Sequence, residues 1–138
     1  VVSLVDLVAT IVDLAGAPGI EDLDGESLTA LIKGGEKGWK NEAFSEYLAH
    51  GVTWPMAMLR RGDFKFNTSL GDPPELYNLV QDPGEFNDLA GNPVYREILE
   101  DFQLQMQKRW NPEFLDQQVR QSQKERRLIE VATRVRNQ

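Results

Sequence analysis

Apolar residues near the start of the chain recur at helical spacing, at Leu4, Leu7, Val8, Ile11, Val12 and Leu14. Steps of three and four residues place these side chains on one side of a helix, so the pattern predicts a helix with a broad buried stripe. Ser3 followed by Asp6 is typical of a helix start, and Gly16 with Pro18 is typical of a helix end. Residues 27–32 predict a second, short helix whose serine caps it.

Strand-like patterns follow in the middle of the chain, at residues 42–49, 55–61, 63–68 and 75–79. Gly62 and Asp63 suit a type II′ turn that joins the second and third of these strands. Beyond the last strand, Asp82 with Pro83 and Gly84 predicts a type II turn. No helical pattern lies between the strands, so the sheet they form should be antiparallel.

The last third of the chain returns to helical spacing, with a stripe at Tyr95, Leu99, Phe102, Met106 and Trp110. Asn-Pro pairs at 92–93 and 111–112 are helix starts, each with an N-cap followed by a proline at N1. The apolar stripe of the final helix is interrupted by the polar run 120–127. Such a helix cannot pack wholly on its own domain, so we expect it to reach a partner subunit or another part of a longer protein.

These elements predict an α+β fold in which a small antiparallel sheet of about four strands packs with N-terminal and C-terminal helices. We expect one domain over residues 1–111 and a C-terminal helical extension over 112–138.

The net charge of −7 is unevenly distributed. Residues 1–110 carry 18 acidic against 9 basic side chains, a balance of −9, and the rest of the chain has a balance of +2. An acidic body repels phosphate, which argues against a nucleic-acid partner. No apolar run approaches the roughly 20 residues of a membrane span, so no membrane partner is expected either.

The chain contains no cysteine, which excludes disulfides, thiolate metal sites and a cysteine nucleophile within it. Cysteine usage leaves the compartment open, and we expect the cytoplasm rather than the periplasm. The first residues show neither an initiator methionine nor the pattern of a signal peptide. We therefore expect the chain to begin inside a longer protein.

Two residues in the loop after the first strand are candidates for ligand contact. His50 is the single histidine, and Trp54 lies next to Pro55. The loop could reach over the mouth of an active site, where the indole would face a quaternary ammonium group. The alternative is a loop histidine with a tryptophan packed beside the proline. A single histidine also excludes a two-histidine metal site.

Two charged groups allow similar alternatives. The basic residues Arg60, Arg61 and Lys65 could form part of an anion site or simply pair with the abundant acids. The acids at 82, 85 and 88 lack the spacing of a calcium loop, and turn formation explains them better.

Three segments resemble the C-terminal region of sulfatases of the alkaline phosphatase superfamily. They are residues 3–16 with 23–28, residues 58–66, and residues 75–90. Ala9 departs from the pattern, because these proteins more often have a proline there. The tail, with residues 109–112 and 119–129, is similar to that of choline sulfatases.

The resemblance implies a two-part enzyme whose catalytic groups lie upstream of this chain. That part would hold a formylglycine nucleophile and a divalent metal, calcium or manganese. No catalytic, cofactor-binding or metal residue can be assigned to the present chain, which would complete the fold and shape the pocket rim. The implied partners are this N-terminal catalytic part, a small sulfate ester and further copies in a homo-oligomer. The alternatives are a phosphonate monoester or phosphodiester hydrolase of the same superfamily, and a non-catalytic interaction module.

Overall fold

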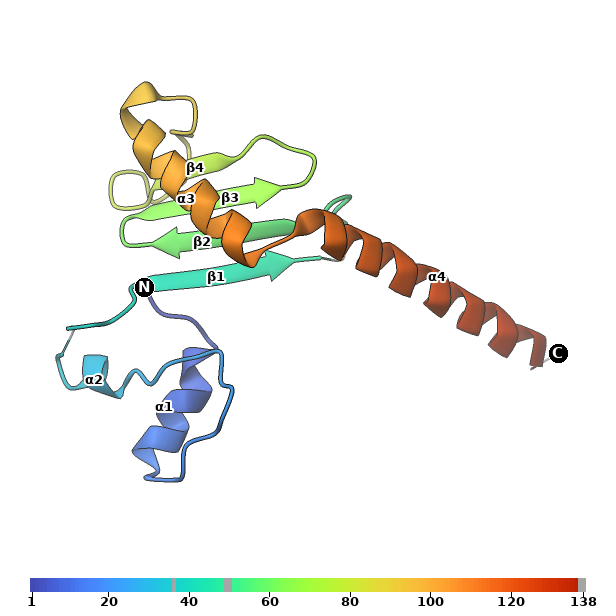
Figure 1. Cartoon of the computed structure of the whole chain (residues 1–138), viewed down its shortest axis with the longest axis horizontal. Coiled ribbons are helices and arrows are strands. Elements are labelled where there is room, and N and C mark those ends of the chain that lie inside the picture. The colour runs from blue at the N-terminus through green and yellow to red at the C-terminus, as the bar shows by residue number, and fades with distance from the viewer. Residues whose placement is uncertain (36, 49–50, 137–138) are drawn as a thin grey trace.

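The computed structural model describes residues 1–35, 37–48 and 51–136; for residues 135 and 136 it describes the backbone alone. Figure 1 shows two N-terminal helices, a four-stranded sheet and two C-terminal helices. The elements in chain order are α1 (Asp6–Leu14), α2 (Thr29–Ile32), β1 (Glu42–Tyr47), β2 (Met56–Arg61), β3 (Phe64–Ser69), β4 (Glu75–Asn78), the 3-10 turn η1 (Pro93–Tyr95), α3 (Arg96–Arg109) and α4 (Pro112–Arg136). The α+β class is confirmed.

The sheet is an antiparallel meander in the order β1-β2-β3-β4. Arg61 pairs with Phe64, which leaves only Gly62 and Asp63 in the β2–β3 turn. A type II′ turn requires a positive φ at its first central residue and not at its second. Gly62 has a φ of 55° and Asp63 has no positive φ, so both conditions of the predicted turn are met. β1 and β4 end within two residues of their predicted limits, although Ala49 lies outside the described residues.

The core lies between one face of the sheet and α3, which crosses the strands in Figure 1. Its buried side chains come from three strands, α3 and the residue after it: Ala57, Leu59, Phe66, Leu76, Phe102, Met106 and Trp110. The helical stripe predicted from 95 to 110 is therefore confirmed as core. At its end the Trp110 indole donates to a Glu46 carboxylate oxygen over 3.2 Å, which ties the helix to β1.

The Asp82 turn differs from its prediction. The N–H of Glu85 donates to the Asp82 carbonyl over 3.2 Å, but Gly84 has no positive φ, which a type II turn requires. The left-handed conformation is instead at Glu85, with φ 56°. The Asp82 carboxylate accepts from the N–H of Asn87 over 2.7 Å, and this local bond closes the loop in another form.

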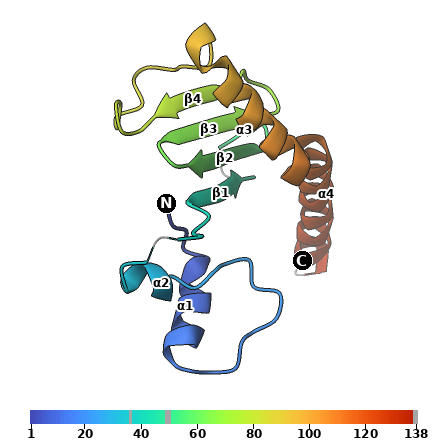
Figure 2. The same ribbon diagram turned by 60° about the vertical axis from the view of Figure 1, so that its left-hand side comes forward.

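The predicted buried stripe on α1 is wrong for this chain. Its buried residues are Asp6 and Thr10, and Val12 is half-buried, whereas the other five positions of the predicted stripe have exposed fractions between 45% and 82%: Leu4, Leu7, Val8, Ile11 and Leu14. In Figures 1 and 2, α1 and α2 lie beyond the β1 edge and away from the sheet–α3 core. No described part of the chain is placed to cover the stripe.

α4 begins as predicted, because the Asn111 side chain accepts from the N–H of Phe114 over 3.0 Å. Leu115 packs against the core, and from there the helix leads away from the body (Figure 1). Leu128, Ile129 and Val131 are exposed on its far half. The prediction that this helix is only partly packed on its own domain is confirmed, whereas the boundary at residue 112 stays a prediction.

Candidate functional site

Trp54 lies where the loop before β2 meets α4. The Arg120 guanidinium of α4 stands 5.3 Å from the centre of its ring, and the indole lies so close to Gly71 that a side chain there would collide with it. Trp54 is exposed, with 37% of its surface accessible. The indole therefore already faces a cation from the chain's own last helix.

A hollow of about 460 Å³ lies beside this contact, lined by residues 51–55 and by α4. Its charged side chains are Asp116, Arg120 and Arg126. The Asp116 carboxylate accepts from Arg120 Nε over 2.7 Å, and this bond raises the pKa of Arg120 above its ordinary value. His50, the other candidate in this loop, lies outside the described residues. The hollow is a basic, partly open surface with one aromatic side chain.

The contact between Arg120 and Trp54 can be tested in the chain by itself. Arg120→Ala should shift the ¹⁹F resonance of fluorotryptophan-labelled Trp54, because the cation that stands over the ring is removed. Trp54→Phe identifies the signal, and Arg127→Ala on the exposed part of α4 is the matched control. An unchanged Trp54 resonance in Arg120→Ala would show that the guanidinium does not occupy the indole face.

The basic cluster of the β2–β3 hairpin is divided between the two faces of the sheet. Arg61 forms an ion pair with Asp101 on α3, and this bond lowers the pKa of that carboxyl. Lys65 pairs with Glu85 over 2.6 Å. Arg60 has no ion pair among the described residues, and its Nε is buried without a hydrogen-bond partner there. The alternation of strand side chains therefore places Arg61 on the face opposite Arg60 and Lys65, so the three cations do not form one site.

The acids at 82, 85 and 88 serve the loop itself. Asp88 accepts from the N–H groups of Leu76 and Ala90, and Glu85 pairs with Lys65. The hydrogen bond from the Asn87 N–H lowers the pKa of Asp82. Across the described residues, no group of three or more His, Cys, Asp or Glu side chains is placed to hold a metal ion.

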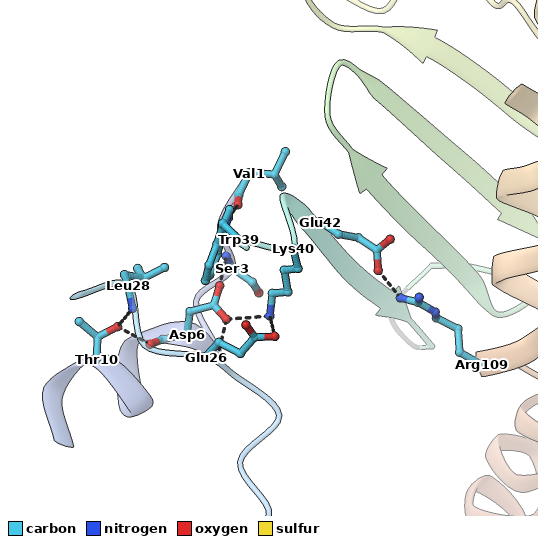
Figure 3. Close-up of polar contacts among 10 residues, drawn as sticks. All are labelled: Val1, Ser3, Asp6, Thr10, Glu26, Leu28, Trp39, Lys40, Glu42 and Arg109. Atoms are coloured by element: carbon cyan, nitrogen blue, oxygen red, sulfur yellow. Dashed lines mark hydrogen bonds and ion pairs between the residues drawn. The ribbon is translucent and has the colours of Figure 1, made fainter. Parts of the chain in front are cut away.

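A buried carboxylate joins three separate segments near the N-terminus, and sequence analysis did not single it out (Figure 3). Asp6 has no exposed surface, and it accepts from the N–H of Ser3, the N–H of Glu26 and Lys40 Nζ over 2.8, 3.1 and 3.1 Å. Thr10, one turn later, accepts from the N–H of Leu28 over 2.9 Å. We call Asp6 and Thr10 with these partners the N-terminal clamp.

The clamp is structural in its chemistry. Burial raises the pKa of Asp6, but the hydrogen bonds from two N–H groups and Lys40 outweigh it and place the pKa below its ordinary value. A charged, fully engaged carboxylate is a poor proton donor or acceptor. One part of the helix start predicted at Ser3 is confirmed, because the Ser3 N–H donates a hydrogen bond to the Asp6 carboxylate. The other part is wrong, because no side-chain cap bond forms at the first turn.

The family described as N-sulphoglucosamine sulphohydrolase, C-terminal, matches residues 1–111. A choline-sulfatase from Rhizobium meliloti is 32% identical over 139 residues, covering 96% of this chain and 27% of that protein. A Delta 4,5-hexuronate-2-O-sulfatase from Bacteroides thetaiotaomicron is 38% identical over 101 residues, covering 68% and 20%.

Solved structures agree with these relatives. A 2-O GAG sulfatase is 33% identical with a TM-score of 0.67, covering 75% of this chain and 23% of that chain. A phosphonate monoester hydrolase of Agrobacterium radiobacter is 26% identical with a TM-score of 0.60, covering 83% and 24%. The chain therefore belongs to the sulfatase C-terminal family, as the sequence resemblance implied. It spans about a quarter of the length of the choline-sulfatase it matches.

The family implies a formylglycine and a divalent metal, and the residues of this chain do not fit either group. The sequence has no cysteine, and the acids described above are engaged in turns, in ion pairs and in the N-terminal clamp. No catalytic step is therefore assigned to this chain. No described helix combines the length and hydrophobicity that a membrane crossing requires.

Proposed function

We propose that this chain is the C-terminal part of a sulfatase that hydrolyses sulfate esters, and that the catalytic residues lie in an N-terminal part. The chain completes the fold of that enzyme and forms part of its pocket rim. The observation that carries the proposal is the uncovered apolar stripe on α1 in a chain whose family is a sulfatase C-terminal region.

The uncovered stripe favours a missing neighbour over a free-standing interaction module. Contiguous apolar patches are uncommon on proteins that act alone, and they mark surfaces that another unit covers. The exposed positions of α1 follow helical spacing, so one packed surface would bury them together. The relatives named above extend well beyond the matched part, which supplies room for such a unit.

The substrate we propose is a sulfate ester of a small organic alcohol. The likeness to choline-sulfatase covers 96% of the chain, including the tail, and supports this choice. Trp54 and His50 remain our candidates for the rim. Because Arg120 now faces the indole, a cationic head group would bind there only if it displaced that side chain. Formylglycine and a calcium or manganese ion would belong to the catalytic part.

The likeness to phosphonate monoester hydrolase supports one alternative, which a substrate comparison separates. We expect the longer protein that carries this chain to have a higher kcat/KM for choline sulfate or an aryl sulfate than for the monophenyl ester of an alkylphosphonate. The assay measures released sulfate and released phenol under the same conditions. A preference for the phosphonate by tenfold or more would favour the alternative.

We further propose that the far half of α4 supports a homo-oligomer. Its exposed Leu128, Ile129 and Val131 sit on a basic helix, whereas the body of the chain is acidic. Removing residues 122–138 leaves Leu115 and Arg120 in place, so it should lower the oligomeric state in light scattering while the core stays folded. Glutamine at all three positions, which preserves the helix, should have the same effect. An unchanged mass in both variants would contradict this role.

A further inference from the structure

One face of the sheet carries no helix. Side chains at alternate positions of β2 point to opposite faces, and Ala57, Leu59 and Arg61 contact or face α3. In Figure 1, α3 covers that face, α1 and α2 lie beyond the β1 edge, and α4 leads away from the end of the sheet. Alternation and register place Glu75 and the buried Tyr77 of β4 on the opposite side. They also place there six residues that we call the open sheet face: Tyr47, Met56, Met58, Arg60, Lys65 and Asn67.

The open sheet face carries one uncompensated cation. Arg60 stands opposite Ala43 on one neighbouring strand and opposite Lys65 on the other. Lys65 is neutralised by Glu85, whereas no described acid pairs with Arg60. Like charges directly opposite each other on a sheet destabilise it, and a buried guanidinium nitrogen without a partner adds a further cost. A carboxylate that approaches the guanidinium from outside the chain would remove the first of these costs.

The surroundings of Arg60 match the composition of a protein interface. Met56 and Tyr47 are exposed and pair across β1 and β2, and Met58 lies half-buried between them and Arg60. Methionine, tyrosine and arginine are enriched where proteins bury a surface against a partner. A guanidinium in that setting is suited to a bidentate contact with a carboxylate.

We infer that the open sheet face docks onto the catalytic part of the sulfatase and that Arg60 pairs there with a carboxylate of that part. This inference rests on the proposed function, because it takes its partner from it. It adds a specific anchor: the interface is held by an ion pair at Arg60 as well as by the apolar stripe of α1. Arg60 is a positioning residue, with no contact to substrate.

The test uses Arg60→Met in the longer protein that carries this chain and also in the 138-residue chain alone. Methionine fills similar space without a charge. In the longer protein, Arg60→Met should accelerate thermal inactivation at least tenfold, and Arg60→Lys should restore part of the loss. In the chain alone, Arg60→Met should leave the unfolding midpoint unchanged or raise it, because an unpaired charge is removed. Arg96→Met, on an exposed arginine at the start of α3, is the matched control.

Two results would overturn the inference. If Arg60→Met destabilises the chain alone as much as the longer protein, Arg60 serves the sheet itself. If inorganic sulfate stabilises the chain alone and Arg60→Met abolishes that effect, the face is a small-anion site. The readout is stability rather than turnover, so a longer protein that prefers phosphonates would disprove the proposed substrate and leave the docking result standing.

Discussion

Phe102→Ala is expected to destabilise the chain by about 3–5 kcal/mol, because it removes the largest side chain that α3 places in the core. Phe102 is 2% exposed and lies with its ring centre 6.0 Å from that of Phe66. The Arg61 guanidinium stands 4.7 Å from the ring centre on another side. Truncation therefore leaves a cavity between helix and sheet that rigid strands cannot close. Urea unfolding followed by circular dichroism measures the loss.

Leu104→Ala is the matched control for Phe102→Ala. Leu104 lies two residues later on the same helix, with 50% of its surface exposed. The helix propensity of the new residue is the same in both variants, so the difference between them isolates burial. Leu104→Ala should cost less than about 1 kcal/mol. Equal losses in the two variants would mean that α3 does not pack on the sheet through Phe102.

Asp6→Ala is expected to cost about 2–3 kcal/mol in the N-terminal region, because it leaves two N–H groups and a lysine without their shared acceptor. Ser3, Glu26 and Lys40 come from three segments that meet at this carboxylate (Figure 3). Hydrogen exchange at Glu26 and Leu28 reports the loss directly. Glu21→Ala, in the exposed loop between α1 and α2, is the control. Unchanged exchange in Asp6→Ala would show that the clamp does not hold these segments.

The same carboxylate predicts a pH dependence. The folded pKa of Asp6 lies below its ordinary value of 3.8, so folding favours the charged form. Its contribution is therefore fully present above the unfolded pKa and is lost as the pH falls through the folded pKa. Wild type should lose protection at Glu26 below about pH 4, whereas Asp6→Asn should show a weaker dependence there. An equally steep loss in Asp6→Asn would assign the effect to other acids.

The sequence predicted the elements whose signals are local. Gly62 predicted the position of the hairpin turn, and Asn111 with Pro112 predicted the start of α4. The apolar stripe from 95 to 110 predicted which face of α3 packs in the core. Each of these features depends on the conformational preference of one residue or on spacing within one helix. Asp82 shows the limit of such signals, because the same residues fit two turn types and side-chain hydrogen bonds decide between them.

The remaining features depend on contacts between distant segments. The clamp needs Glu26 and Lys40 beside Asp6, and the occupied face of Trp54 needs a helix that begins 58 positions later. The exposure of α1 has a different cause. Its spacing indicates burial, but the surface that we propose for it belongs to another part of the enzyme. The apolar spacing therefore predicts that α1 is buried in the complete enzyme, where we propose its covering surface lies, and not in this chain by itself.

The central claim is that this chain completes a sulfatase and carries none of its catalytic residues. The most direct measurement is sulfate release from choline sulfate or an aryl sulfate by two samples: the 138-residue chain alone, and the longer protein that carries it. The account predicts turnover by the longer protein and none by the chain alone. Turnover by the chain alone that is abolished by one substitution within residues 1–138 would contradict it.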